Sequence, residues 1–243
     1  MFVECLLIVG KNMTCARTVD IVLVLDQSRN IVNESDDNWD VQVLGFAKRI
    51  AGAFLIHRNL TQIGLMKFSH DVEVLFHLNA YGDRQSMLKA INNVTISGGD
   101  TNIAAALRTA REMMFTEQNG SRPDVPKILI LLTYGTANLE ESNTLPEADL
   151  TKAANITIYT VGVTDEVDED QLRVIASTPD YFFFAPNFTQ LSSAVQQVVE
   201  NLCKEATTTT TPSTATSNTT TPMTTTTTTS TTTTTAITTT RGL

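Results

Sequence analysis

The 243-residue sequence has no apolar stretch approaching the roughly 18 residues that a membrane-spanning helix requires. Basic residues are also scarce, because 17 Lys and Arg stand against 26 Asp and Glu, for a formal net charge of −9. Phosphate binding needs concentrated Lys and Arg, so this balance argues against a nucleic-acid partner. The hydrophobic fraction of 42% is enough for one domain with a substantial core.

Motifs for catalysis and nucleotide binding are missing too. No glycine-rich phosphate loop follows the first apolar run, and the chain has neither a Gly-x-x-x-x-Gly-Lys-Ser/Thr nor a Gly-x-Ser-x-Gly motif. His57, His70 and His77 lack metal-ligand spacing, and the acidic run at 165–170 indicates a negatively charged helix start rather than a calcium loop. We therefore expect no enzymatic activity, with an α/β enzyme as a remote alternative.

The two ends of the chain differ in composition from its centre. From Thr207 onward the sequence is mostly threonine, with nothing large to bury, so residues 204–243 are predicted to be extended and disordered. This composition is typical of an O-glycosylated, mucin-like stalk, and an unmodified linker is the alternative. Residues 1–17 are interpreted as either the remnant of a secretory signal or a fragment boundary.

N-glycosylation motifs indicate a location outside the cell. Asn-x-Ser/Thr patterns begin at Asn12 and Asn218, and the candidate sites between them are Asn33, Asn59, Asn93, Asn119, Asn155 and Asn187. Their number exceeds chance, although the excess of threonine inflates it. With the stalk, they predict an extracellular protein that is either secreted or presented on a surface.

Three cysteines fit that location. Cys15 lies four residues before the first predicted strand, and Cys203 lies at the end of the last amphipathic stretch. A disulfide between them would join the two ends of one domain and contribute up to roughly 5 kcal/mol. Cys5 would then be left over, removed with a signal or available to pair with another chain. Three free thiols in a cytosolic protein are the alternative, which the stalk and the glycosylation motifs disfavour.

Fully apolar runs alternate with stretches of helical periodicity. The predicted strands are 19–25, 62–68, 72–78, 127–133, 156–163 and 181–184. The predicted helices are 39–56, 84–91, 102–115, 145–154, 168–176 and 188–202. Strands that are apolar throughout are buried on both faces, which implies a mostly parallel sheet covered by helices. We therefore predict a doubly wound α/β fold, with a hairpin that makes one edge strand antiparallel.

Four segments in order resemble the von Willebrand factor type A domain, the module that includes the integrin I domain. They are VDIVLVLDQS, SGGDTNIAAAL, KILILLTYGTAN, and ITIYTVGV followed by LRVIASTPDYFFFAPNFTQL. The resemblance covers roughly residues 18–203, and the cysteine pair fits extracellular members. It implies a Rossmann-like fold and a metal-ion-dependent adhesion site (MIDAS). There, a divalent cation sits above the sheet and an acidic side chain of a partner completes its coordination.

When the ligand positions of the family are transferred to this sequence, the implied metal site has changed residues at some of them. Asp26, Ser28 and Thr101 match family ligands, whereas Asn30 replaces a serine and Tyr134 replaces an aspartate. Mg²⁺ prefers six hard oxygen ligands, and a neutral phenol removes one negative charge, worth about 4 kcal/mol at 4 Å and an effective dielectric of 20. We therefore expect no cofactor, or weakly bound Mg²⁺. Alternatively, Asp26 and Ser28 cap the strand end and bind loop backbone N–H groups.

The expected function is extracellular protein binding, in cell adhesion or in the extracellular matrix, by a domain with a degenerate MIDAS. The partner would be an extracellular protein, with a matrix or collagen-like protein as one candidate, bound through the loops around residues 26–30, 99–102 and 134–138. The alternative is a structural unit of a mucin-like matrix or coat that associates with itself through helix faces or Cys5.

Overall fold

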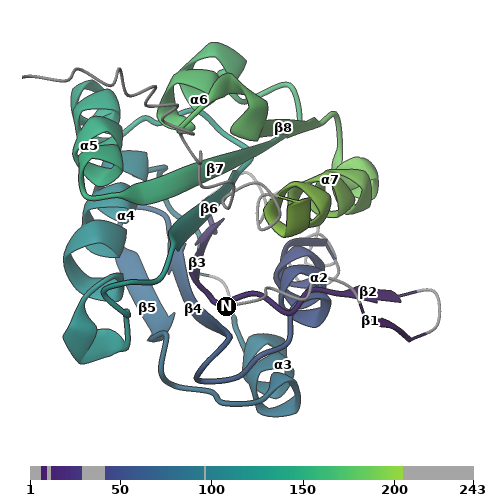
Figure 1. The fold of residues 1–243 in the computed structure, drawn as a ribbon. Helices are drawn as coiled ribbons and strands as arrows, with labels where there is room; N and C mark the ends of the chain where they lie inside the picture. Colours follow the sequence, from purple (N-terminus) through teal and green to yellow (C-terminus); the bar gives the residue numbers. More distant parts are fainter. Residues whose placement is uncertain (1–6, 10–11, 29–41, 96, 205–243) are drawn as a thin grey trace, which may run out of the picture. The chain divides into compact units, whose positions relative to one another are not determined.

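The computed structural model describes residues 7–9, 12–28, 42–95 and 97–204. At its centre lies a six-stranded sheet of order β5-β4-β3-β6-β7-β8 (Figure 1). The strands are β3 (Val19–Asp26), β4 (Thr61–Phe68), β5 (Val72–Phe76), β6 (Lys127–Thr133), β7 (Ile156–Val163) and β8 (Phe182–Ala185). All neighbouring pairs are parallel except β4 and β5. The predicted doubly wound sheet with one antiparallel edge strand is confirmed.

Helices cover both faces of this sheet. They are α2 (Leu44–Ala53), α3 (Arg84–Asn92), α4 (Ile103–Thr109), α5 (Glu141–Ala153), α6 (Glu169–Ile175) and α7 (Leu191–Lys204). Buried side chains of α2, α3 and α7 belong to one apolar cluster, and those of α4, α5 and α6 to the other. Figure 1 shows α2 and α7 on one side of the sheet and α4 and α5 on the opposite side.

The central strand β3 shows why an unbroken apolar run folds this way. All eight of its residues are buried, and successive side chains point to opposite faces. Ile21 and Leu23 enter the cluster under α2 and α7, whereas Val22 and Val24 enter the cluster under α4 and α6. Both faces therefore require apolar residues, so the alternation of a half-exposed strand is absent.

Several predicted helix ends were wrong. The helix predicted to run to Ile56 ends at Ala53, because Phe54 and Ile56 form β-bridges with Cys15 and Thr61. α5 begins at Glu141 rather than at 145, and α4 gives way to a π-helical turn at Ala110–Met114. The predicted helical residues 39–41 lie outside the described residues. At Ala53, tertiary pairing, which local periodicity does not encode, sets the helix end.

Two regions near the chain ends complete the description. β1 (Leu7–Val9) and β2 (Asn12–Thr14) pair as a separate antiparallel ladder. Apart from Lys204 at the end of α7, the predicted threonine-rich tail lies outside the described residues. Among the helices that the structure describes, none is both long enough and apolar enough to cross a membrane.

Candidate functional site

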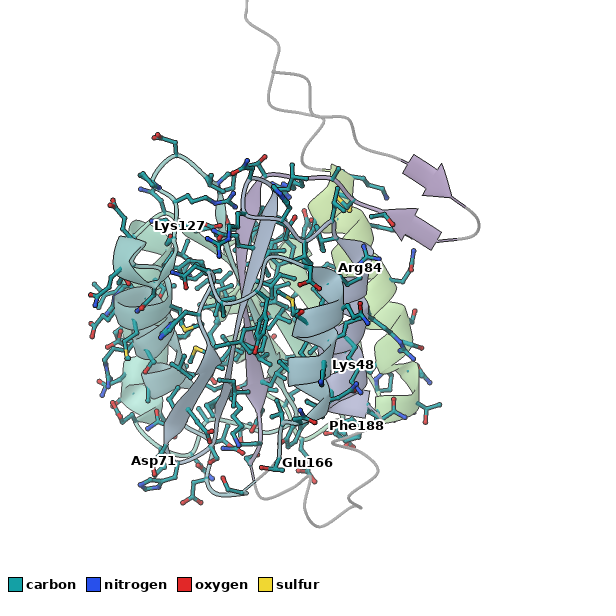
Figure 2. All side chains as sticks on the ribbon, turned by 90° about the horizontal axis from the view of Figure 1, so that it is seen from below. Lys48, Asp71, Arg84, Lys127, Glu166 and Phe188 are labelled. Atoms are coloured by element: carbon teal, nitrogen blue, oxygen red, sulfur yellow. The ribbon has the colours of Figure 1, made fainter. Side chains whose placement is uncertain are left out.

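A cavity of about 260 Å³ lies at the carboxyl edge of the parallel strands. The residues that line it are Ser28, Gly99, Asp100, Thr101, Gly135, Thr136, Asn138 and Glu166. β3, β6 and β7 are parallel, so the loops that follow them converge at this edge, where ligands of open α/β sheets bind. Figure 2 shows Glu166 and Asp71 at one end of the molecule and Lys127, where β6 begins, at the other.

Asp26, the last residue of β3, is fully buried beneath this edge. Its Oδ1 accepts a hydrogen bond from the Ser28 N–H at 2.8 Å, and its Oδ2 accepts one from the Thr133 hydroxyl at 2.7 Å. Burial raises the pKa of Asp26 from 3.8 to about 6, against the opposing effect of these hydrogen bonds. Both carboxylate oxygens thus accept hydrogen bonds from within the protein, one from a backbone N–H and one from a side chain. A hydrogen bond from a loop N–H to Asp26 is what the capping alternative predicts.

Tyr134 lies beside Asp26 in the core. Its ring packs against Phe188 with centroids 5.7 Å apart, and only 2% of the residue is exposed. Burial, followed by the charge of Asp26, raises the pKa of Tyr134 far above its usual value, so the phenol stays neutral. The position where the family carries a second carboxylate therefore contributes no charge.

Two hydroxyl groups in this region stand out. Ser28 Oγ lies near enough to Asp26 and Tyr134 to lower the pKa of both. Yet neither Ser28 Oγ nor the Tyr134 hydroxyl makes a hydrogen bond of normal geometry with any residue that the structure describes. A buried polar atom without such a bond is uncommon, because desolvation costs about 1–3 kcal/mol. Ser28 also lines the cavity.

Thr101 is held in the cavity wall by the loop that follows β6. Its N–H donates to Asn138 Oδ1 at 2.8 Å, and its carbonyl accepts from the Asn138 N–H at 3.1 Å. Gly99 adopts a φ of +138°, and a Cβ there would lie 2.9 Å from Ser69 Oγ, so a larger residue would not fit. The segment that carries Thr101 and the loop that follows β6 are therefore held together.

An ion-pair network that the sequence analysis missed supports these loops from the side. Glu140 accepts from Arg108 at 2.7 Å and from the Asn102 amide at 3.1 Å, and Arg108 also binds Glu147 at 2.8 Å. The hydrogen bond from Arg108, together with those from Asn102 and Asn143, lowers the pKa of Glu140 to about 2. Asn102 Oδ1 in turn accepts from the Ala105 N–H and caps α4. No sequence motif marks this network, because its members lie on separate elements.

The structure brings together four of the five predicted site residues. Asp26, Ser28, Thr101 and Tyr134 meet at the carboxyl edge, whereas Asn30 lies outside the described residues. In the part of the chain that the structure describes, no three His, Cys, Asp or Glu side chains are grouped to hold a metal ion. The four described positions of the predicted site supply one carboxylate whose two oxygens each accept a hydrogen bond, two hydroxyls and a neutral phenol, which does not fit a tight divalent-cation site.

The predicted disulfide residues lie in one core cluster. Cys15 and Cys203 are both buried, and both belong to the apolar cluster under α2 and α7. Arg17 donates a hydrogen bond to the carbonyl of Leu202, so the segments that carry the two cysteines lie side by side. Their pairing stays a prediction.

The candidate glycosylation sites differ in exposure. Asn59, Asn93, Asn155 and Asn187 are exposed, and Asn33 lies outside the described residues. Asn119 is half-buried, and its side-chain nitrogen donates to the Met113 carbonyl at 2.8 Å. Modification of these residues stays a prediction.

Comparison with known proteins decides the family. The model of the von Willebrand factor type A (VWA) domain matches residues 20–197. The chain belongs to the VWA domain family. This VWA domain is 30% identical over 191 residues to the transmembrane cell adhesion receptor mua-3 of Caenorhabditis elegans. The match covers 77% of this chain and 5% of the receptor. The domain is 31% identical over 196 residues to the collagen alpha-1(XII) chain of Notophthalmus viridescens, and this match covers 80% of our chain and 20% of the collagen chain. The similarity therefore spans a small part of either relative.

Solved structures give the same fold. Proximal thread matrix protein 1 of the mussel byssus superposes with a TM-score of 0.74 at 28% identity, covering 78% of this chain and 49% of that one. That protein has also been solved with a zinc-occupied MIDAS motif. The manganese-loaded TRAP protein of Plasmodium vivax, with a TM-score of 0.61 at 18% identity over 75% of this chain and 74% of that one, supports the fold alone.

Proposed function

We propose that this VWA domain is a non-enzymatic adhesion or extracellular-matrix module that binds an extracellular protein through the loops around the carboxyl-edge cavity. The observation that carries the proposal is the cavity itself, built from the loops after β3, β6 and β7 and the segment before α4, and braced by the contacts of Thr101 and Glu140. The relatives include a cell adhesion receptor and a collagen chain, which supports this class of partner. A matrix or collagen-like protein is the first candidate.

We propose further that the degenerate MIDAS binds Mg²⁺ weakly or not at all, so that partner binding does not depend on a metal. Mg²⁺ would have to compete with the Ser28 N–H and the Thr133 hydroxyl for the oxygens of Asp26. Tyr134 supplies no second carboxylate to compensate the charge of the cation. The zinc-occupied motif of the mussel protein belongs to that protein.

The setting that we propose is extracellular. The relatives named above include a cell adhesion receptor and a collagen chain, and eight glycosylation motifs and a threonine-rich tail occur in this sequence. In this proposal the tail, residues 204–243, is an O-glycosylated stalk and the Cys15–Cys203 disulfide closes the domain.

The test is binding of the full chain to immobilised collagens and other matrix proteins, followed by surface plasmon resonance. Thr136, exposed on the cavity wall, is replaced by Trp, and the matched control is Gln118→Trp, exposed before the amino end of β6. Thr136→Trp should weaken binding about tenfold or more, because the ring blocks the cavity, while the control binds normally.

Two results would overturn parts of the proposal. Equal binding by both Trp variants and the wild type would place the partner elsewhere on the domain. Loss of binding in EDTA that Mg²⁺ restores would show that the metal-independent version is wrong.

A structural, self-assembling role is the second candidate. The similarity to a thread matrix protein of the mussel byssus favours it. Sedimentation velocity of the full chain in reducing and non-reducing buffer tests this role, and a strict monomer in both buffers excludes it.

A further inference from the structure

Asn187 is an exposed glycosylation candidate at the carboxyl edge of the sheet. It follows β8, which ends at Ala185 and runs parallel to β7. The loop after β8 therefore emerges at the same edge as the loops that form the cavity. Figure 2 shows Phe188, the next residue, toward the same end of the molecule as Glu166, with Lys127 at the other end.

A ring contact ties this loop to the cavity wall. The Phe188 ring packs against the Tyr134 ring, with centroids 5.7 Å apart. Tyr134 is followed directly by Gly135 and Thr136, which line the cavity. Asn187 precedes Phe188 in the chain, so it lies one residue away from a direct contact with the cavity wall.

Hydrogen bonds join the same segments through the loop after β7. Thr164 donates its N–H to the Ala185 carbonyl at 2.9 Å, and its hydroxyl donates to the Tyr134 carbonyl at 3.4 Å. The ends of β6, β7 and β8 are thereby linked in the order in which they lie in the sheet. A group attached to Asn187 would therefore stand next to the cavity and not on a distant face.

The amide of Asn187 can carry a glycan without losing its part in the fold. Its Oδ1 accepts a hydrogen bond from the Gln190 N–H at 3.0 Å and caps the short 3₁₀ turn Phe188–Gln190. Glycosylation changes Nδ2 and leaves the oxygen as an acceptor, so the cap and the glycan are compatible. Thr189, which completes the motif, is exposed as well.

The motif at Asn119 shows how the fold can instead oppose this modification. Its Nδ2 donates to the Met113 carbonyl at 2.8 Å, and the residue is half-buried. Ser121, which completes that motif, is only 5% exposed. A glycan on Asn119 would compete with this hydrogen bond, a conflict that the arrangement at Asn187 avoids.

Two other exposed candidates lie at the opposite edge of the sheet. Asn155 directly precedes β7, and Asn59 lies two residues before β4 begins at Thr61. The amino ends of parallel strands point away from the cavity, so glycans on these residues would leave its entrance open.

We infer that Asn187 carries an N-linked glycan, which stands beside the carboxyl-edge cavity and limits the size of the partner that can reach it. The inference rests on the proposed function, whose extracellular setting supplies the modification, and it adds a control on the same site. In the transfer, Asn187 Nδ2 forms a bond to the anomeric carbon of a lipid-diphosphate-linked oligosaccharide. The bond from that carbon to the diphosphate oxygen breaks, the lipid diphosphate leaves, and the amide loses one proton.

The first part of the test asks whether Asn187 is modified. The full chain, secreted from mammalian cells, is deglycosylated by an amidase in ¹⁸O water, which converts a glycosylated Asn to ¹⁸O-labelled Asp that mass spectrometry locates. We expect label at Asn187 in the wild type and in Thr189→Ser, and none in Thr189→Ala, which destroys the motif but keeps the Asn187 side chain. An unlabelled Asn187 in the wild type would overturn the inference.

The second part measures access to the cavity without any partner. Thr136→Cys, combined with Cys5→Ala, places a thiol on the exposed cavity wall, and its reaction rates with a small maleimide and a long polyethylene-glycol maleimide are compared. Because a glycan is bulky, adding Thr189→Ala should speed the reaction with the long reagent about threefold or more. The rate with the small reagent should stay the same.

Two matched controls separate shielding of the cavity from a general effect. Gln118→Cys places the thiol before the amino end of β6, where Thr189→Ala should leave both rates unchanged. Asn155→Gln removes the motif before β7 and should not alter the rates of Thr136→Cys. Equal rates for the long reagent with and without Thr189→Ala would overturn the inference. Equal acceleration at both thiols, or by Asn155→Gln, would overturn it as well.

The proposed function can fail separately from this inference. Neither readout uses the matrix partner, so an unmodified Asn187 leaves the comparison of Thr136→Trp with the wild type intact as the test of partner binding. If Thr136→Trp has no effect on the partner, the proposed function fails, whatever the labelling of Asn187 and the maleimide rates show.

Discussion

Thr133 donates its hydroxyl hydrogen to Asp26 Oδ2 over 2.7 Å, from the last residue of β6 to the last residue of the adjacent strand β3. The strands are in parallel register, with Leu25 opposite Leu132, so this contact follows directly from the sheet. Hydrogen bonds from Thr133 and Ser28 thereby hold the carboxylate in the core. Its ionisation should therefore be visible in the stability of the domain.

The first prediction concerns the pH dependence of stability in metal-free buffer. Burial raises the pKa of Asp26 from 3.8 to about 6, so the folded state binds this proton more tightly than the unfolded state. The contribution is therefore fully present below about pH 4 and is lost as the pH rises through 6. Asp26→Asn removes this titration, and at pH 7.5 the variant should be up to about 3 kcal/mol more stable than the wild type.

Urea unfolding at pH 4.5 and pH 7.5 in EDTA checks this prediction. In the Asp26→Asn variant, the new side-chain amide would still accept from Ser28 and could donate to Thr133, whose hydroxyl lies 3.1 Å from the Gly135 carbonyl. Asp124→Asn is the control, because its carboxylate is exposed. A constant difference in stability between Asp26→Asn and the wild type at both pH values would contradict the assignment.

The second prediction concerns Mg²⁺ affinity, measured by isothermal titration calorimetry. Tyr134→Asp restores a carboxylate beside Asp26 and should bind Mg²⁺ at least about tenfold more tightly than the wild type. Tyr134→Asn is the matched control, because it leaves the same space beside Phe188 without the charge. Both variants should lose about 3–5 kcal/mol of stability, so circular dichroism must first show that they are folded. Equal affinity in the wild type and Tyr134→Asp would refute our interpretation of position 134.

Much of this fold could be predicted from the sequence, because burial on both faces requires an unbroken apolar run. The strands β3, β6 and β7 follow such runs almost residue for residue. The convergence of Asp26 and Tyr134 was also predictable, since Asp26 ends one strand of a parallel sheet and Tyr134 follows another, whereas Thr101 lies just before α4. Local sequence and sheet topology carry this information together.

The contacts that support the site could not be predicted in the same way. Arg108 reaches Glu140 and Glu147 across 32 and 39 residues, and Thr101 reaches Asn138 across 37. These pairs depend on how α4 and the segment before it pack against α5 and the loop after β6, which no short-range pattern reports. Likewise, to predict that both oxygens of Asp26 accept hydrogen bonds, one must know where the Thr133 hydroxyl lies in space, and its place in the sequence does not give this.

The third prediction tests the amino edge of the sheet, where Asp20 is fully buried. Arg122 donates to Asp20 Oδ1 from Nη2 at 2.6 Å and from Nε at 2.9 Å, and its own N–H donates to Oδ2 at 2.8 Å. Arg122→Leu leaves the carboxylate buried without its counter-ion and should cost about 3–5 kcal/mol of unfolding free energy. Urea unfolding at pH 7 measures this loss.

The control for this pair is the double variant Asp20→Asn with Arg122→Leu. Because it removes the buried charge together with its partner, it should lose less stability than Arg122→Leu alone. Binding of the matrix partner should be unchanged in every variant that remains folded, since the pair lies at the end of β3 opposite the cavity. Weaker partner binding by a folded Arg122→Leu variant would contradict this separation of the two edges.

The last prediction concerns Cys15 and Cys203. If they form a disulfide, proteolysis without reduction should yield one linked peptide pair, identified by mass spectrometry. The variants Cys15→Ala, Cys203→Ala and their combination should then each lose about 2–4 kcal/mol, because each removes the same bond. Two independent buried thiols would instead give losses that add in the double variant. Cys5→Ala, which changes the cysteine outside the described residues, should leave the unfolding free energy unchanged. An unlinked digest with additive losses would exclude a covalent closure, and the hydrogen bond from Arg17 to Leu202 would then remain a non-covalent tie between the two segments.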